Sequence, residues 1–304
     1  MLSPRHAVVL VLLTLVWGVN WPVMKVGVTG FPPLTFRALS MVLGLPVLGA
    51  ALLALRLPLR IPREHWPELA KLALANMVVW HVLVILAIPL LTSGRAAILG
   101  YTMPVFSAMW GAALFGQRLA PRQMAGVLAA TIGIALLLWH ELGRLAGAPV
   151  GVAMMLVAAV AWGLGTQWLR ATRMPVPTLT IAFWMTAATT VVLCALAAAT
   201  ESARWQRPSA AVTGAIVFNA VAIFGFAHAA WFYLARSLPP VASTVSVMMI
   251  PVVGALSGAA WLGETLHWQD GAAVVLMMVA IAAVLWPARL RARSAPIGIG
   301  EAEQ

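Results

Sequence analysis

An apolar stretch near the N-terminus carries five residues that a helix built only to cross a lipid bilayer would avoid. They are Trp17, Asn20, Trp21, Pro22 and Lys25. Indole rings stack on flat apolar ligands and attract ammonium groups, and a buried amide bonds either a ligand or a neighbouring helix. Proline frees a backbone carbonyl, which then needs a partner or a wet cavity. We predict Trp17, Asn20 and Trp21 to line a central ligand-binding cavity and Pro22 to act as a hinge. Plain packing and an interhelical hydrogen bond are the alternatives.

A second polar group, Asn76, Trp80 and His81, lies within another apolar stretch. An ionisable side chain at membrane depth faces the interior of the helix bundle or water by default. We therefore assign all three to the cavity, while a hydrogen bond from His81 to a buried helix carbonyl remains open. Asn219 is the loose counterpart of this group in the second half of the chain and is assigned to the cavity too. His228, which follows it, fits an interfacial position better.

Aromatic and proline residues recur deep inside other apolar stretches. Tyr101 and Trp162 fall well inside their stretches, where anchoring at the membrane interface does not explain them. We add both to the cavity, with packing of large side chains as the alternative. Pro104 and Pro251 are further candidate hinges.

Lys25 and Arg170 fall near opposite ends of their helices if both stretches cross a membrane. A simple explanation for Lys25 is that its ammonium reaches the outer surface while its carbon stem stays in apolar surroundings. A functional explanation is that Lys25 and Arg170 mark the two mouths of one pathway and hold opposing gates. Both remain open.

The elements that must position these residues are membrane helices. Of 304 residues, 62% are hydrophobic and only 9% are charged, far from the composition of a soluble domain. Intervals without charge approach the roughly 20 residues that a helix needs to cross the hydrocarbon, and barrel strands would be shorter and alternating. The chain is therefore predicted to be an all-α integral membrane protein with ten transmembrane helices. Their expected ranges are 6–28, 33–55, 67–90, 94–116, 121–140, 149–170, 177–199, 210–235, 239–263 and 267–288.

Basic residues set the expected orientation. With both termini in the cytoplasm, thirteen Lys and Arg fall on the cytoplasmic side and six, including Lys25 and Arg37, on the other. A net charge of +11 spread in this way indicates topology rather than a nucleic-acid surface. One cysteine, Cys194, with no Cys/His cluster argues against a metal site. We expect residues 291–304 to be a disordered cytoplasmic tail.

The sequence repeats itself. Shifted by 145 residues, Trp17-Gly18 falls on Trp162-Gly163, and Lys25 falls on Arg170. Shifted by 147, Pro104 meets Pro251, while Ser107 and Gly111 meet Gly254 and Gly258, a small-xxx-small spacing that lets helices approach closely. We predict two five-helix units, 1–145 and 146–290. Because five is odd, the second unit is inverted, and such pairs enclose a site near the membrane midplane that opens alternately to each side.

These features resemble the EamA-type members of the drug/metabolite transporter superfamily. The resemblance covers nearly the whole chain and rests on the ten helices, the two Trp-Gly pairs, the prolines at 104 and 251, and Gly263-Glu264-x-Leu266. Gln117 stands where that last signature would place a glutamate in the first repeat. The tryptophan-rich interior is most similar to bacterial aromatic amino-acid exporters. The resemblance implies export of small metabolites or amino acids from the cytoplasm across the bacterial inner membrane.

The expected activity is therefore transport without a cofactor or metal, with aromatic amino acids as the first expected substrates and alternating access as the mechanism. All eight Asp and Glu lie outside the predicted helices or at their ends, which favours a facilitator over tight proton or sodium coupling. A broader amino-acid or cationic-drug exporter with histidine-linked proton coupling is the alternative. A membrane enzyme is least favoured, because no paired carboxylates and no HExxH or GxSxG motif appear. The expected partners are a small-molecule ligand and membrane lipid, with a monomer plausible and no nucleic acid.

Overall fold

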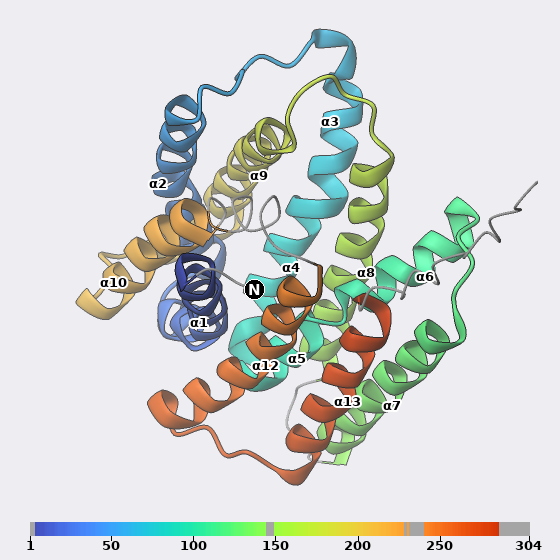
Figure 1. The fold of residues 1–304 in the computed structure, drawn as a ribbon. Coiled ribbons are helices and arrows are strands. Elements are labelled where there is room, and N and C mark those ends of the chain that lie inside the picture. The colour runs from blue at the N-terminus through green and yellow to red at the C-terminus, as the bar shows by residue number, and fades with distance from the viewer. Residues whose placement is uncertain (1–3, 144–148, 228–229, 231–239, 286–304) are drawn as a thin grey trace, which may run out of the picture.

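The computed structural model describes residues 4–143, 149–227, 230 and 240–285, and within these residues every regular element is a helix (Figure 1). The predicted tail, 291–304, the proposed unit boundary at 145/146 and His228 lie outside this part of the chain. The first-half helices are α1 (Pro4–Val28), α2 (Pro33–Ala54), α3 (Trp66–Leu72), α4 (Val79–Ala87), α5 (Ser93–Gly100), α6 (Met103–Phe115) and α7 (Pro121–Gly143). The second-half helices are α8 (Pro149–Ala171), α9 (Thr178–Glu201), α10 (Ala210–Phe218), α12 (Pro240–Leu262) and α13 (Trp268–Leu285).

Short 3₁₀ and π segments extend or interrupt these helices. The 3₁₀ segments are η1 (Arg63–His65), η3 (Ile88–Leu90) and η4 (Ser202–Arg204). The π segments are η2 (Ala73–Val78), between α3 and α4, and η5 (Asn219–Ala227), directly after α10. A π turn adds one residue to the hydrogen-bonded ring, and π turns within helices are frequent at functional sites. Each of the two π segments contains one of the asparagines singled out from the sequence.

The helical runs have the length and composition of membrane spans. Seven runs in the described part of the chain are long and apolar enough to cross a bilayer, and three shorter apolar helices accompany them: Pro121–Leu137, Met248–Leu262 and Trp268–Ala283. The seven and the three fall on the predicted intervals. The predicted class, an all-α membrane-spanning protein, is therefore confirmed, whereas the count of ten crossings and the sides of the termini stay predictions.

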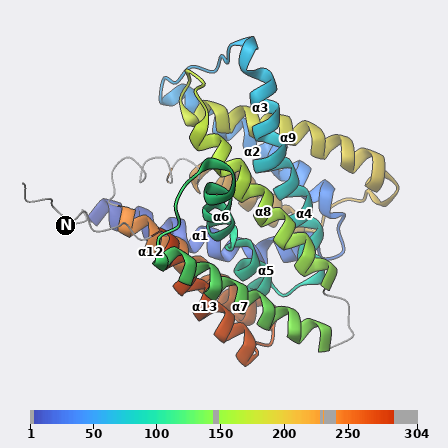
Figure 2. The same cartoon turned by 90° about the vertical axis from the view of Figure 1, so that its right-hand side faces the viewer.

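Helices from the two halves of the chain pack against one another. The pairs are α1 with α12, α2 with α9, α4 and α6 with α8, and α7 with α13. Figures 1 and 2 both show α7 and α13 side by side along one edge of the bundle. Close approach depends on glycine at some crossings: a Cβ on Gly163 of α8 would lie 2.7 Å from the backbone nitrogen of Ser107 in α6. Residues far apart in sequence are thereby brought into one interior.

The candidate hinge prolines occupy two kinds of position. Pro22 and Pro251 lie inside α1 and α12, and both helices continue through them. Pro104 instead lies at the start of α6, just after a break at Tyr101–Thr102 that divides the predicted span 94–116 into α5 and α6. Proline is tolerated in a first helical turn, where its missing N–H has no partner to lose. Whether any of the three acts as a hinge stays a prediction.

One local geometry recurs after 147 residues. Gly116 and Gly263 both have φ of 64°, and each follows the last turn of its helix, α6 or α12. The next residue then turns back, so that the Gln117 N–H donates to Gly111 O and the Glu264 N–H to Gly258 O. A second pair of matching bonds follows each turn. The Ala120 N–H donates to the Gln123 side chain at 2.8 Å, and the His267 N–H donates to the Asp270 side chain at the same distance. The sequence shift of 147 thus matches a shared fold of the two helix ends.

Candidate functional site

Asn76, Trp80 and Trp162 form one contact group between η2, α4 and α8. The two indole rings are tilted, with centroids 5.0 Å apart. Asn76 is buried and donates from Nδ2 to the carbonyl of Trp162 at 3.4 Å and to Thr166 Oγ1 at 3.5 Å. The residues predicted to line a cavity from two different segments therefore do lie together. Whether they touch a ligand remains a prediction.

Arg37, in the second turn of α2, forms a second group with Asn219 of η5. Arg37 is only 3% exposed, and its guanidinium donates from Nη1 to Asn219 Oδ1 at 3.2 Å and from Nη2 to Met24 Sδ at 2.6 Å. Asn219 is completely buried, and its amide donates to Ala215 O at 3.1 Å. Arg37 Nε has no hydrogen-bond partner, and no carboxylate of the described residues forms an ion pair with this arginine.

Arg37 is the functional candidate that the sequence analysis missed. Counting charges placed it on the far side of the membrane as a topology signal, but the structure buries it beside Asn219. A buried charge without an opposite charge is costly, so in a membrane helix it indicates a functional site by default. The sequence did contain an indication of this role, because Arg37 lies within the predicted membrane helix 33–55 rather than in a loop.

The remaining cavity candidates lie on α1, α4 and α5. Trp21 is buried, and its ring meets that of Tyr101 edge to face, with centroids 6.4 Å apart. The His81 ring lies 5.9 Å from that of Phe224 in η5, so it faces the other half of the chain. Asn20 is half-buried, and its Oδ1 is buried without a hydrogen-bond partner. Trp17 packs against two apolar clusters.

The two predicted pathway mouths differ. Lys25 is half-buried, and its Nζ donates to three carbonyls at the end of η3: Ile88 at 2.9 Å, Pro89 at 3.1 Å and Leu91 at 2.6 Å. It therefore fixes the end of α1 to the end of η3 rather than extending freely to a surface. Arg170, near the end of α8, is exposed. The gating roles of both stay predictions.

Carboxylates gather at the end of the bundle where Lys25 lies. Glu264 accepts from the N–H and hydroxyl of Ser93, at the start of α5. Arg95 donates from Nε to Asp270 at 2.6 Å in a buried ion pair. The sequence analysis correctly placed Asp270 and Glu201 outside the helices or at their ends. A position at a helix end does not mean exposure, however, because these two residues are 4% and 1% exposed.

Glu201 lies at the same end of the bundle as Lys25 and bonds α9 to α2. Its carboxylate accepts from the backbone N–H groups of Leu34 and Thr35 at 3.1 and 2.8 Å, and also from the Thr35 hydroxyl. A carboxylate at a helix N-terminus satisfies N–H groups that have no partner within the helix and interacts favourably with the helix dipole. The last residue of α9 thus caps the first turn of α2.

Mainly neutral side chains bond the helices at the opposite end. Gln117 donates to Gln167 of α8 at 3.1 Å, and Gln167 donates to the carbonyl of Ser107 at 2.7 Å. Thr180 of α9 donates to Pro58 O at 2.7 Å, in the loop after α2. One carboxylate also lies at this end, where Glu68 of α3 accepts from Thr172 Oγ1 at 2.6 Å. Within the described residues, carboxylates bond the starts of α2 and α5 at the Lys25 end, whereas amides and hydroxyls make most of the side-chain contacts at the other end.

A polytopic helical bundle with buried amide, indole and guanidinium groups facing one another across its two halves is the architecture of a membrane transporter. The model of the EamA-like transporter family matches this chain twice, at residues 5–139 and 149–286, so the protein belongs to that family.

Similar proteins support this assignment. An uncharacterized inner membrane transporter of Escherichia coli, YedA, is 28% identical over 91% of this chain and 91% of its own length. The uncharacterized transporter YoaV of Bacillus subtilis is 25% identical over 87% of this chain and 89% of its own. A probable amino-acid metabolite efflux pump of E. coli is 27% identical over 54% of this chain and 53% of its own. A solved crystal structure shares the fold with a TM-score of 0.65 at 22% identity, covering 93% of this chain and 96% of that one.

Proposed function

We propose that this protein exports amino acids or closely related carboxylate-bearing metabolites, with aromatic amino acids as the first candidates. This proposal rests on the environment of Arg37, which is buried beside Asn219 and has no carboxylate partner in the described part of the chain. A substrate carboxylate would supply the missing negative charge and can accept two parallel bonds from a guanidinium. The naming of one relative as a probable amino-acid metabolite efflux pump agrees with this class.

The aromatic preference rests on a separate observation. Trp80 and Trp162 bring two indole faces together from α4 and α8, and Asn76 is bonded to the same turn of α8. Indole faces favour flat rings and ammonium groups, both of which an aromatic amino acid carries.

The proposed mechanism is alternating access in the inner membrane, with ten crossings arranged as two inverted units, 1–145 and 146–290, and cytoplasmic termini. The double match to the family model and the shared geometry at Gly116 and Gly263 support two related units. Facilitated export, without a coupled ion, is the form we propose. The two buried carboxylates, Asp270 and Glu201, lie at helix ends and are already bonded to Arg95 and to the start of α2. The chain is expected to act as a monomer.

Counterflow in proteoliposomes tests the substrate class. Purified protein should exchange labelled phenylalanine and tryptophan, and unlabelled 3-phenylpropionate should compete because it keeps the carboxylate. Phenethylamine keeps the ring and ammonium but lacks the carboxylate, and it should compete poorly. No exchange of any amino acid would refute the proposal, while strong competition by phenethylamine alone would favour a cationic-drug exporter.

Substitution tests the role of Arg37. Arg37→Gln should lower phenylalanine exchange at least tenfold, because the carboxylate loses its charged partner, at unchanged protein abundance and monodispersity. Arg207→Gln is the matched control, since Arg207 is exposed in the loop between α9 and α10. Equal exchange by the Arg37 variant and the wild type would remove Arg37 from the site.

A further inference from the structure

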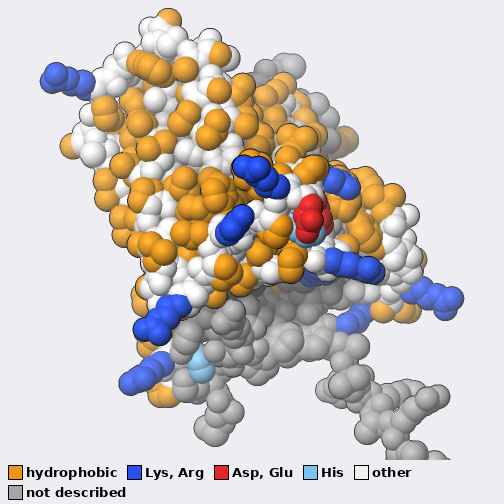
Figure 3. Space-filling model, turned by 90° about the horizontal axis from the view of Figure 1, so that it is seen from above, with side chains coloured by type: hydrophobic (Ala, Val, Ile, Leu, Met, Phe, Trp, Pro, Cys, Tyr) orange, Lys and Arg blue, Asp and Glu red, His pale blue; other side chains and the backbone are white. Residues whose placement is uncertain are grey.

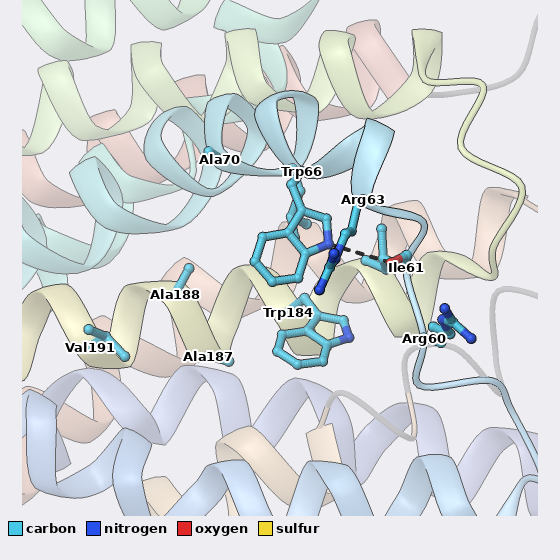
Figure 4. Close-up of a pocket in the computed structure, with 10 residues that line it drawn as sticks. Arg60, Ile61, Arg63, Trp66, Ala70, Trp184, Ala187, Ala188 and Val191 are labelled. Carbon is cyan, nitrogen blue, oxygen red and sulfur yellow. Dashed lines mark hydrogen bonds between the residues drawn. The ribbon is translucent and has the colours of Figure 1, made fainter.

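A groove of about 540 Å³ opens between α3 and the first half of α9 (Figure 4). Leu69 and Ala70 of α3 form one wall, and Ala187, Ala188 and Val191 of α9 form the other. Both helices belong to runs with the composition of membrane spans, Arg63–Leu90 and Thr178–Arg204. The groove therefore begins near the membrane boundary and continues into the hydrocarbon.

The walls of the groove are apolar and open. Val191 is 70% exposed and Trp66 is 56% exposed, although both are large apolar side chains. From Trp184 to Val191 the strip along α9 is about 10 Å long, at ~1.5 Å per residue. Apolar surface of this kind, within a membrane span, is covered by a hydrocarbon chain.

Two arginines stand at the mouth of the groove. Arg60 and Arg63 are both exposed, and Figure 4 shows them on the side where the loop before α3 enters. Among the described residues, neither acidic residue of the same turn forms an ion pair with these arginines. The Glu64 side chain is 77% exposed, and Glu68 accepts from Thr172 Oγ1 at 2.6 Å. No acidic residue is among the described residues that line the groove.

The surrounding face of the protein is also basic. Figure 3 views the molecule from above Figure 1, where the loop before α3 lies: Lys and Arg side chains are spread over this face, while acidic side chains gather at one place. An anion approaching this face therefore meets a positive field.

Tryptophan side chains fix the loop that carries Arg60. Trp66 donates from Nε1 to Ile61 O at 3.4 Å, and Trp184 donates to Leu59 O at 2.5 Å. Each indole thus packs its apolar body along the groove and bonds the loop with its polar edge, as tryptophan does at membrane interfaces. The loop is held with Arg60 at the mouth.

We propose that this groove binds one anionic phospholipid from the surrounding membrane. The phosphodiester lies between Arg60 and Arg63, and an acyl chain lies along α9 from Trp184 to Val191. Basic pockets between membrane helices recognise anionic head groups through charge, and the adjoining apolar strip adds the requirement for a chain. The site is independent of the proposed substrate, because it shares no residue with the Arg37 or Trp80 groups.

Native mass spectrometry of the purified full-length protein in detergent tests this site. Phosphatidylglycerol should bind with a 1:1 first step at least tenfold more tightly than phosphatidylcholine of the same chains. The double variant Arg60→Gln/Arg63→Gln should lose that preference. The control Arg56→Gln/Arg173→Gln removes the same charge from exposed loop positions outside the groove and should keep it.

Two further arms separate the head group from the chain. Glycerol phosphate, which lacks an acyl chain, should bind at least tenfold more weakly than phosphatidylglycerol, and Ala187→Phe, which fills the apolar wall, should weaken lipid binding while the arginines remain. Equal losses in both double-arginine variants would show general charge attraction and overturn the site. Equal binding of glycerol phosphate, no lipid preference in the wild type, or a lipid-free dimer covering the groove would overturn it as well.

Discussion

The ends of α6 and α12 share one backbone geometry and differ in the side chain that it presents. At both ends a glycine with φ of 64° reverses the chain, and the following N–H returns to the helix. At α6 that residue is Gln117, which bonds the buried amide of Gln167. At α12 it is Glu264, whose carboxylate caps the first turn of α5 through Ser93. The same turn therefore makes a neutral join at one end of the bundle and a charged join at the other.

This comparison also gives two glycines a second role. From the sequence, Gly111 and Gly258 belonged to a small-xxx-small pattern that brings helices together. In the structure a Cβ at Gly111 would lie 2.5 Å from Gln117 Oε1, and one at Gly258 would clash with the Glu264 carboxylate. Their missing side chains leave room for the returning residue. The predicted close approach of helices holds as well, because the same Cβ atoms would lie 3.1 Å from Gln167 Nε2 in α8 and 3.0 Å from Ser93 Cβ in α5.

The largest expected effect comes from the ion pair that the α12 end has and the α6 end lacks. Arg95→Gln leaves Asp270 buried without its arginine and should lower the free energy of unfolding by roughly 3–5 kcal/mol. Adding Asp270→Gln copies Gln123, the residue at the equivalent position of the α6 end, and should recover most of the loss. Unfolding in mixed detergent–SDS micelles measures both. A double variant as unstable as the single would contradict this account.

Removing the returning side chains should have a smaller and unequal effect. Glu264→Ala removes the acceptor of the Ser93 N–H and hydroxyl at a helix start and should cost about 1–3 kcal/mol. Gln117→Ala removes one neutral bond from an exposed residue and should cost about 0.5 kcal/mol. The same unfolding assay compares them, and Glu264→Gln, which keeps one acceptor oxygen, should fall between. Equal costs at 117 and 264 would show that charge does not distinguish the two ends.

The glycines of the two turns should respond alike. Gly116→Ala and Gly263→Ala each place a side chain in the left-handed region, at a cost of roughly 1 kcal/mol, and neither new Cβ has a neighbour within 4 Å. Matching losses in the unfolding assay are expected. A difference above about 1 kcal/mol would mean that the two turns are not energetically equivalent.

Removing the donor group of Gln117 is expected to have the smallest effect. Gln117→Glu keeps the shape and supplies the side chain found at the α12 end, but it can no longer donate to Gln167 Oε1. The expected loss is a few tenths of a kcal/mol, because the residue is exposed and water replaces the partner. Gln167→Glu, which alters the buried member, should cost more in the same assay. The reverse order would contradict the assignment of Gln167 as the buried anchor.

The sequence predicted the helices well because lipid imposes a simple requirement. A span needs a long uncharged run, and the predicted 33–55 and 149–170 differ from α2 and α8 by one residue each. The break at Tyr101 was missed because polar backbone can be satisfied locally there. The Thr102 hydroxyl donates to Leu99 O at 2.6 Å, a bond that hydropathy does not register.

The site was only partly predictable. Asn76, Trp80 and Trp162 were singled out because polar and aromatic groups are unusual at membrane depth, and they do make contact. Arg37 was misplaced because each charge was read as a marker of the membrane surface. Its partner Asn219 lies 182 residues further along the chain, and only the fold brings the two together.

The cap that Glu201 places on α2 has a mechanical consequence. Three donors of Leu34 and Thr35 share one carboxylate, which Arg204 also contacts at 3.3 Å. Near the opposite ends of α2 and α9, the polar bond from Thr180 reaches a loop carbonyl rather than the other helix. A rearrangement that preserves the Glu201 bonds must therefore rotate α2 and α9 about this point. The two helices then separate most at their opposite ends, near Ala54 of α2 and Thr178 of α9.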